Sequence, residues 1–378
     1  MGKHLVLVGG GHAHMTAMAK CGDFIYKGHR VTLISPSPYQ YYSGMGPGAL
    51  SQTYRPQDIR FHVAKMVQDR GAVFTRGQVV RIDAPGRVLE LAGGERITYD
   101  VVSFNIGSGI ALHEEAAAKN HVIPVKPIIN LLKGQKKIIR EAGHHSLKLL
   151  VLGGGPAGVE IAGNLWALMQ NLGKTAEITL VAGAQLLRKM PPKIRTLALS
   201  ILLPRGIRIL EGVHAQIAAE NRAVLTDGSH LEFDFAFVST GVVPPPLFRD
   251  SGFSTAADGG LPVNPFLQSQ AFPEIFGGGD CIHFQDRPLD KVGVFAVRQN
   301  PILHQNLLNA LEGLPLQRFV PQKDYLLILN LGAGVGIFGR QNLIFGGRPA
   351  FFFKNWIDGA FMRKFQLSGE RNEPENLI

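Results

Sequence analysis

The chain has 378 residues, 45% of them hydrophobic, which is enough for two or three domains with large cores. Its net charge of +10 would suit an anionic membrane surface, nucleic acid or phosphate-rich cofactors. No nucleic-acid-binding motif accompanies the charge, so we exclude nucleic acid as a partner.

Cysteine usage and hydropathy indicate the compartment. The two cysteines, Cys21 and Cys281, lie far apart and in no C-x-x-C pattern. This predicts a reducing compartment without a structural disulfide, and we assign no metal-binding residues. No run approaches the ~18 apolar residues of a transmembrane helix, and no signal peptide is recognisable. We therefore expect a cytoplasmic protein, either free or peripheral on the cytoplasmic face of a membrane.

The N-terminus carries a strand–turn–helix unit. Residues 5–8 (LVLV) form the apolar run that a buried parallel strand needs, and Gly9, Gly10 and Gly11 follow directly. Such a turn lets the backbone approach a pyrophosphate, while the helix N-terminus supplies free N–H groups and a positive dipole. We expect His12 and His14 to be structural rather than catalytic.

The expected second strand, residues 29–34, ends at Ser35, where an acid usually binds ribose hydroxyls. Residues 36–50 (PSPYQYYSGMGPGAL) then combine tyrosines with glycines. This segment could wall a flat ring or be an ordinary Gly/Pro loop. Its position directly after the second strand favours a flavin-binding loop.

A second unit of the same kind lies at residues 149–160 (LLVLGGGPAGVE). It has the full G-x-G-x-x-G spacing at Gly153, Gly155 and Gly158. The next expected strand, residues 178–181, again ends without an acid, and Arg188 and Lys189 follow it. Basic residues there suit the 2′-phosphate of NADPH, but exposed loop residues are an equally good interpretation.

Later segments complete the pattern. We expect a basic helix over 128–140, and FGGGDC at 276–281 places Asp280 after a third glycine cluster. Residues 291–311 read as a long helix that Pro301 should kink or restart. Two phosphate-binding turns and a late Gly-Asp predict two dinucleotides bound by one chain.

The tail contains strand-like runs at 325–331 and 336–345 and a helical segment at 349–367. At helical spacing one face collects Phe353, Trp356, Ile357, Ala360, Phe361 and Phe365. The cations Lys354, Arg363 and Lys364 lie elsewhere on this helix. Such a basic amphipathic helix either contacts a membrane surface or covers the core or a partner subunit, which leaves a homodimer open.

The order of these parts resembles the flavoproteins with two dinucleotide-binding domains. The matching segments are 8–11, Val79 in GQVVRID, 105–108, 153–160, 240–241 and 279–280. The resemblance implies an α/β fold with two Rossmann-like domains and a C-terminal α+β region. The FAD domain is discontinuous (1–125 and 246–314), the NAD(P)H domain (126–245) is inserted into it, and 315–378 form the C-terminal region.

A narrower resemblance rests on GGGHAH, YYSGMGPG, KVGVFAVRQ and KNWIDGAFMRKF. These segments resemble the flavoprotein domain fused to selenophosphate synthetase in some organisms. That group is related to type II NADH:quinone and sulfide:quinone oxidoreductases. The two-glutamine quinone motif of the type II enzymes is absent, because those positions are Val294 and Arg298.

The resemblance implies the site residues. For FAD they are Gly9, Gly11, His12, Ser35, Ser43, Gly44, Met45, Val79, Gly107, Asp280, Lys291, Val292 and Gly293. For NADH or NADPH they are Gly153, Gly155, Gly158, Glu160 and Gly241. Lys291 receives the one catalytic role, because an ammonium and a helix N-terminus would stabilise the negative charge of a reduced flavin.

Cysteine positions separate the possible reactions. Residues 36–50 contain no cysteine, so the dithiol of a disulfide reductase is missing, as are the cysteines of sulfide:quinone oxidoreductases. We expect hydride transfer from NAD(P)H to flavin N5 and electron transfer to a second small-molecule acceptor, preferably a quinone. The alternatives are an oxidoreductase acting on sulfur or selenium species and a non-catalytic flavin-binding regulatory protein.

Overall fold

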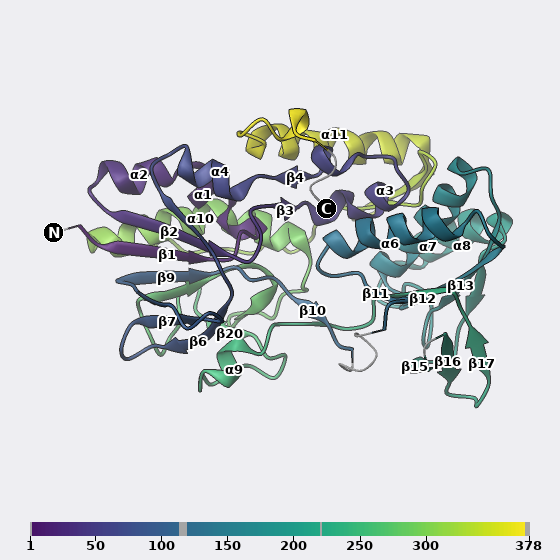
Figure 1. Cartoon of the computed structure of the whole chain (residues 1–378), viewed down its shortest axis with the longest axis horizontal. Helices are drawn as coiled ribbons and strands as arrows, with labels where there is room; N and C mark the ends of the chain where they lie inside the picture. The colour runs from purple at the N-terminus through teal and green to yellow at the C-terminus, as the bar shows by residue number, and fades with distance from the viewer. Residues whose placement is uncertain (1, 113–118, 220, 375–378) are drawn as a thin grey trace.

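Two parallel β-sheets organise the chain (Figure 1). The computed structural model describes residues 2–112, 119–219 and 221–374. The first sheet has the strand order β21 (Ile275–Gly277), β9 (Val101–Phe104), β1 (His4–Val8), β2 (Arg30–Ser35) and β5 (Val73–Arg76). All five residues of β1 are buried, as expected for a central strand that helices and neighbouring strands enclose.

The second sheet has the strand order β11 (Val122–Pro124), β18 (Phe235–Val238), β12 (Leu147–Leu152), β13 (Ala176–Val181) and β14 (Arg208–Leu210). The chain leaves the first sheet after β9, forms the second sheet, and returns to the first with β21. The predicted α/β fold with two Rossmann-like sheets is therefore confirmed. The domain boundaries at 125, 245 and 314 stay predictions.

Helices cover both sheets (Figure 1). Those on the first sheet are α1 (Met15–Ala19), α2 (Cys21–Tyr26), α4 (Val63–Gln68) and α10 (Gly293–Glu312). Those on the second are α6 (Ile129–Glu141), α7 (Pro156–Asn171) and α8 (Pro192–Leu202), with the short α3 (Gly46–Leu50) against α6 and α7. The short α9 (Leu247–Asp250) packs against β6 (Val79–Asp83).

The predicted restart of the long helix at Pro301 is wrong, because α10 continues through this residue. Tertiary contacts hold the helix just before the proline. Gln299 Oε1 accepts a hydrogen bond from Gly279 N at 2.7 Å, and Asn300 Oδ1 accepts one from Thr16 N at 2.5 Å. Both side chains are buried, so the surrounding fold compensates for the hydrogen bond that the proline cannot donate.

Smaller sheets flank the two large ones. Two are antiparallel meanders, one of β6, β7 (Val88–Leu91) and β8 (Arg96–Thr98), the other of β15 (Ala215–Ala219), β16 (Arg222–Leu225) and β17 (His230–Glu232). Three are strand pairs: β3 (Gln40–Tyr41) with β4 (Arg60–Phe61), β20 (Leu261–Val263) with β22 (Ile282–Phe284), and β10 (Gly109–Ile110) with β19 (Val242–Val243). The β10–β19 pair joins the two segments that connect the large sheets.

The C-terminal region is an antiparallel sheet followed by a helix. The sheet contains β23 (Leu327–Asn330), β24 (Gly336–Arg340) and β25 (Leu343–Gly347), and α11 (Arg348–Phe365) follows directly. The second predicted run, 336–345, is therefore a hairpin that turns at Gln341, whose φ is +51°. In Figure 1 helix α11 lies along one edge of the molecule, above α3 and the junction of the two sheets.

The buried residues of helix α11 share only Phe365 with the predicted apolar face. Its buried residues are Ala350, Lys354, Asp358, Met362 and Phe365, whereas Phe352, Phe353 and Trp356 are exposed. Lys354 and Asp358, one helical turn apart, form an ion pair of 3.0 Å that makes their burial tolerable. Lys354 lies off the predicted apolar face, but it is buried there rather than exposed.

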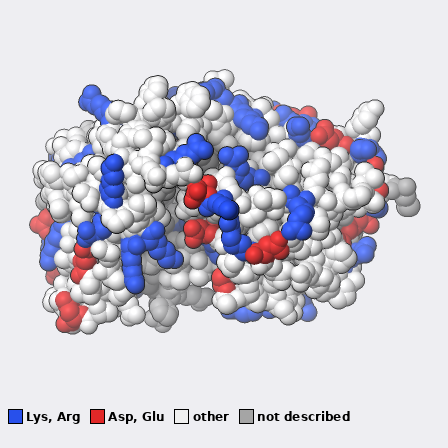
Figure 2. All heavy atoms as spheres, turned by 180° about the vertical axis from the view of Figure 1, so that it is seen from behind, with Lys and Arg blue, Asp and Glu red and all other residues white. Residues whose placement is uncertain are grey.

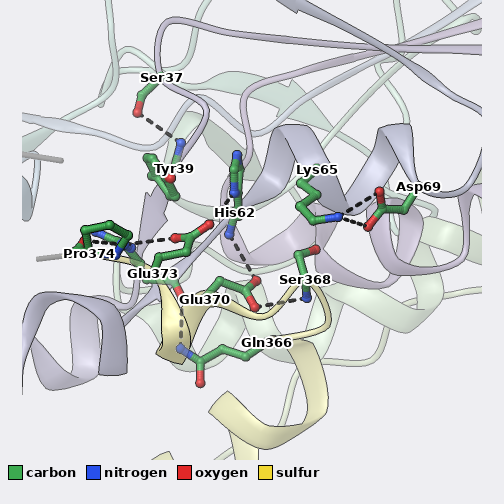
Figure 3. A network of polar contacts seen from close by, with 11 residues as sticks. Ser37, Tyr39, His62, Lys65, Asp69, Gln366, Ser368, Glu370, Glu373 and Pro374 are labelled. Atoms are coloured by element: carbon green, nitrogen blue, oxygen red, sulfur yellow. Dashed lines mark hydrogen bonds and ion pairs between the residues drawn. The ribbon is translucent and has the colours of Figure 1, made fainter.

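The chain after α11 folds back onto the first sheet's loop region (Figure 3). Glu373 accepts a hydrogen bond from Arg60 Nη2 at 2.9 Å and pairs with His62 Nδ1 at 2.6 Å. Glu370 Oε1 accepts a hydrogen bond from His62 N at 3.1 Å. Because Arg60 is fully buried, these contacts fix the end of α11 on the strands that follow the expected flavin loop.

The surface is consistent with the dispersed positive charge of the sequence. On the face shown in Figure 2, Lys and Arg are spread across the molecule with Asp and Glu between them. Within the described ranges, no helix is both long enough and apolar enough to span a membrane.

Candidate functional site

The first glycine turn is packed tightly against the residue that follows β9. At Gly9, with φ +88°, a Cβ atom would lie 2.4 Å from the carbonyl oxygen of Asn105. At Gly11 it would lie 2.4 Å from Asn105 Oδ1. These positions therefore require glycine, and the turn lies at the edge of the sheet where the parallel strands end.

His14 connects this turn to β9 through both of its ring nitrogens. Its Nδ1 lies 2.7 Å from the carbonyl oxygen of Gly9, and its Nε2 lies 2.8 Å from Ser103 Oγ. Burial lowers the pKa of His14 to about 4, so the ring is neutral at physiological pH. His14 thus takes the structural position expected from the sequence.

Asp280 lies at the same edge, in the turn between β21 and β22. Its Oδ2 accepts hydrogen bonds from Lys126 Nζ at 2.6 Å and Ser108 Oγ at 2.7 Å. Burial alone would raise the pKa of Asp280, but Lys126, Ser108 and Lys291 outweigh it and the pKa is lowered. The carboxylate is therefore ionised and positioned by residues that follow β9 and β11.

Two polar groups beside the turn have no hydrogen-bond partner within the described part of the chain. They are His12 Nε2 and Asn105 Nδ2, and both atoms are buried. Burial lowers the pKa of His12 to about 4, with Lys126 acting in the same direction and Asp280 against it. Buried polar groups are nearly always paired, so these two fit a site that takes a polar ligand.

The expected flavin loop lies next to this turn. The ring of Tyr42 is 5.4 Å from that of His12 and stacks on Phe361 of α11 at 4.8 Å. A Cβ atom on Gly293, the first residue of α10, would lie 3.3 Å from Ser43 Oγ. The structure thus brings the segment of Ser43, Gly44 and Met45 together with Val292 and Gly293.

Lys291 is bound by neighbouring protein groups. Its Nζ donates hydrogen bonds to the carbonyl oxygens of Asp280 at 2.9 Å and Ile282 at 3.1 Å. It also lies 3.0 Å from Asp258 Oδ2. Lys126, which sequence reasoning missed, has its ammonium at the carboxylate of Asp280 instead. The basic segment from 126 to 140 contains no motif that could single it out.

The remaining FAD candidates are Ser35, Gly107 and Val79. Ser35 ends β2, and Gly107 follows β9 with open space around the position of a Cβ atom. Val79 lies outside the large sheet, at the start of β6, and is buried. Val79 is therefore supplied by the meander of β6, β7 and β8.

The glycines of the second turn have two different roles. A Cβ atom on Gly158 would lie 1.8 Å from the carbonyl oxygen of Gly153, so Gly158 serves close packing. At Gly155, the N-cap of α7, no heavy atom lies within 4 Å of the ideal Cβ position. There is therefore room for a ligand beside the N-cap of α7, where the first N–H groups of a helix lack partners within the helix, as a phosphate site requires. Gly241, with φ +57°, lies just beyond the end of β18.

Glu160 lies on the same helix but points toward the C-terminal region. Its Oε1 accepts a hydrogen bond from Asn330 N at 2.8 Å. Burial raises the pKa of Glu160 to about 7, and the ammonium of Lys354 opposes this shift. The sequence suggests an NAD(P)H contact for Glu160, whereas these contacts connect it with α11.

Four polar residues form a cluster on the buried side of α11, which we call the α11 polar cluster: Tyr42, Glu160, Lys354 and Asp358. Lys354 Nζ donates to the carbonyl oxygen of Gly44 at 2.7 Å and lies 3.0 Å from Asp358 Oδ2. Tyr42 Oη donates to Asp358 Oδ1 at 3.0 Å. These hydrogen bonds join the flavin loop to α11, and the ammonium of Lys354 also interacts electrostatically with Glu160 of α7.

In the described part of the chain, neither the cysteines nor the potential metal ligands form a second candidate redox site. Cys21 and Cys281 are free and buried, and burial raises the pKa of each to about 11. Among the residues that the structure describes, no group of His, Cys, Asp and Glu could hold a metal ion.

Several known proteins resemble this chain. The chain is 24% identical over 395 residues to the type II NADH:quinone oxidoreductase of Staphylococcus saprophyticus, covering 97% of this chain and 96% of that protein. It is 27% identical over 291 residues to ferroptosis suppressor protein 1 of Taeniopygia guttata, 74% of each chain. The solved structure of NDH2 from Plasmodium falciparum in complex with NADH shares the fold, with a TM-score of 0.82 at 13% identity over 100% of both chains.

The profile of one protein family matches most of the chain. The family is described as pyridine nucleotide-disulphide oxidoreductase, and the match covers residues 3–305. Both glycine turns and Asp280 lie within it, as does the connection between the two sheets. The chain therefore belongs to the pyridine nucleotide-disulphide oxidoreductase family, whose members bind FAD and NAD(P)H.

Proposed function

We propose that this chain takes hydride from NAD(P)H and passes electrons to a quinone, with FAD as its redox group. FAD, when bound, supplies the chemistry that links a two-electron donor to this acceptor. The two glycine turns support two dinucleotide sites, and burial of both cysteines argues against a thiol step.

The first turn and its neighbours would hold FAD. The backbone of Gly9 and Gly11 would face the pyrophosphate, and Asp280 would accept hydrogen bonds from hydroxyl groups. His12 Nε2 and Asn105 Nδ2 would find partners on the cofactor. We assign the stabilising ammonium to Lys126, because the protons of Lys291 are directed at two carbonyls and Asp258.

The observation that carries the quinone proposal is the α11 polar cluster. Reducing a quinone to a quinol consumes two protons together with two electrons. Glu160, whose pKa is about 7, can hold a proton at neutral pH and release it beneath α11. The ammonium of Lys354 contacts Gly44 of the flavin loop, so a proton source lies where the acceptor would approach.

The outer face of α11 supports access from a membrane. Phe352, Trp356 and Phe353 are 68%, 62% and 45% exposed, and Arg363 and Lys364 are exposed beside them. Aromatic side chains suit the depth of lipid headgroups, and the cations would meet anionic lipid. A lipid-soluble quinone would then reach the α11 polar cluster from the bilayer.

The test compares the reduction rates of two acceptors, a quinone, which takes up protons with its electrons, and ferricyanide, which takes up electrons alone. We expect Glu160→Gln and Lys354→Met to retain flavin reduction by NAD(P)H and reduction of ferricyanide, which needs no proton. Quinone reduction should fall at least tenfold in both variants. The control Glu177→Gln alters an exposed carboxylate of β13 and should leave all three rates unchanged. Equal losses with ferricyanide and quinone would contradict the proposed proton role.

A second class of electron acceptor is sulfur or selenium species. It is suggested by the narrower resemblance to the flavoprotein domain fused to selenophosphate synthetase. Its test uses the same preparation, with polysulfide or selenite in place of quinone. Faster reoxidation by either species than by quinone would favour this alternative. A protein that NAD(P)H does not reduce would be a non-catalytic flavin protein.

A further inference from the structure

We infer that Arg188 and Lys189 form a subsite for the 2′-phosphate of NADPH in the second dinucleotide site. This inference rests on the proposed use of NAD(P)H and names which of the two nucleotides the site is built to take. It concerns the loop between β13 and α8.

The loop begins where the adenosine ribose of a dinucleotide is usually bound, at the end of the second strand. A Cβ atom on Gly154 would lie 2.4 Å from the carbonyl oxygen of Ala182, so the glycine turn touches the end of β13. Ala182 N donates to Leu210 O at 2.8 Å, and Gly212 N donates to Gly183 O at 2.7 Å. The strand end is thus fixed on both sides.

Two backbone hydrogen bonds then fix the loop itself. Leu186 N donates to Glu211 Oε1 at 2.7 Å, and Leu187 N donates to Gly154 O at 2.7 Å. The side chains of both leucines are buried. Arg188 therefore directly follows a residue that is hydrogen-bonded to the second glycine turn, and this restricts where the Arg188 side chain can reach.

The charges of this loop favour an additional phosphate. Residues 182–195 (AGAQLLRKMPPKIR) contain four cations and no Asp or Glu. Arg188 and Lys189 are exposed, and in the described ranges neither makes a side-chain hydrogen bond or ion pair. They are therefore available to a dianionic group, for which a guanidinium and an ammonium are both suited.

The carboxylate of Glu211, which contacts this loop, is already bound by protein groups. Glu211, just after β14, lies 2.8 Å from Arg195 Nη2 in addition to its contact with Leu186 N. Although burial acts in the opposite direction, these partners lower the pKa of Glu211, and its charge is balanced by Arg195. A free carboxylate here could bind the ribose hydroxyls of NADH and repel a 2′-phosphate. Glu211 is not free for this role, because Arg195 and Leu186 N bind it.

The binding experiment uses the FAD-loaded protein and two fragments that differ in the 2′-phosphate. Calorimetry compares adenosine 2′,5′-bisphosphate with adenosine 5′-monophosphate. We expect the bisphosphate to bind at least tenfold more tightly, and the double variant Arg188→Ala/Lys189→Ala to lose this difference. The control Lys174→Ala changes an exposed lysine beyond the opposite end of α7 and should retain it.

Rapid mixing with NADPH and NADH provides the second arm. The wild-type protein should show at least a tenfold higher kcat/KM with NADPH, and the double variant should lose about tenfold to a hundredfold of this ratio. An equal or higher kcat/KM with NADH, or a preference that survives in the double variant, would overturn the inference while leaving the proposed function intact. If neither nucleotide reduces the flavin, the proposed function fails, and the calorimetry alone decides on the subsite.

Discussion

The ammonium of Lys126 lies 2.6 Å from the carboxylate of Asp280, although the two residues are 154 positions apart in the sequence. Lys126 follows β11 of the second sheet, whereas Asp280 follows β21 of the first. Ser108 Oγ contacts both groups at 2.7 Å. The ion pair therefore connects the two sheets at the edge where both glycine turns lie.

Removing one partner of this pair should cost more than removing both. Lys126→Met leaves the Asp280 carboxylate partly buried without its ion-pair partner, which we expect to destabilise the fold by about 2 kcal/mol. The double variant Lys126→Met/Asp280→Asn should recover at least half of this loss. Denaturant unfolding of both single variants and the double variant measures the coupling, and strictly additive effects would contradict it.

Gly155→Glu should block reduction by NAD(P)H and leave FAD bound. The ideal Cβ position is open, so the fold tolerates the side chain, but its carboxylate enters the site of the pyrophosphate. Flavin content and the rate of flavin bleaching measure the two effects. Gly143→Glu is a matched control, because no atom lies within 4 Å of its Cβ position and it is outside the turn. Normal bleaching of Gly155→Glu would show that this turn is not the nicotinamide nucleotide site.

Stability should fall with rising pH because of Glu160. The folded protein raises the pKa of this carboxyl from an ordinary value of 4.5 to about 7, so it binds the proton more tightly than the unfolded chain does. The resulting stabilisation is complete below pH 4.5 and is lost as the pH rises through about 7.

Glu160→Gln cannot ionise and should lack this dependence. Relative to the wild type, the variant should gain about 1–3 kcal/mol of unfolding free energy between pH 5 and pH 8. The control Glu177→Gln, at an exposed position, should follow the wild type across this range. Parallel curves for wild type and Glu160→Gln would show that this carboxyl titrates normally.

Membrane contact should depend on the exposed aromatic residues of α11. Deleting the whole helix is uninformative, because it would remove buried Met362 and Phe365 from the core. We expect Phe352→Ser/Trp356→Ser to lower co-sedimentation with anionic liposomes at least fivefold and to leave ferricyanide reduction unchanged. Tyr26→Ser removes an aromatic residue that is 94% exposed on α2 and serves as the control. Equal sedimentation of all three proteins would mean that this face does not contact lipid.

The sequence predicted the parts of the fold that local patterns encode. Apolar runs that end in glycine predicted β1 and β12, and the spacing of Gly153, Gly155 and Gly158 predicted the turn before α7. These features depend on a few neighbouring residues and therefore survive as sequence patterns.

Contacts between distant segments could not be predicted in this way. Lys126 and Asp358 meet their partners only through the packing of the two sheets and α11. Helical periodicity placed Lys354 off the apolar face, but it could not predict that Asp358 and the carbonyl oxygen of Gly44 bind the ammonium in the interior. Pro301 likewise continues a helix that Gln299 and Asn300 hold in place.

An anaerobic half-reaction experiment tests the central claim most directly. The purified FAD-loaded protein is mixed with NADPH, and the visible flavin band is followed until it bleaches; a quinone analogue is then added. We predict rapid bleaching and stoichiometric return of the band, with one quinol formed per flavin. A flavin that stays oxidised with NADPH and NADH, or a reduced flavin that the quinone does not reoxidise, would contradict the account.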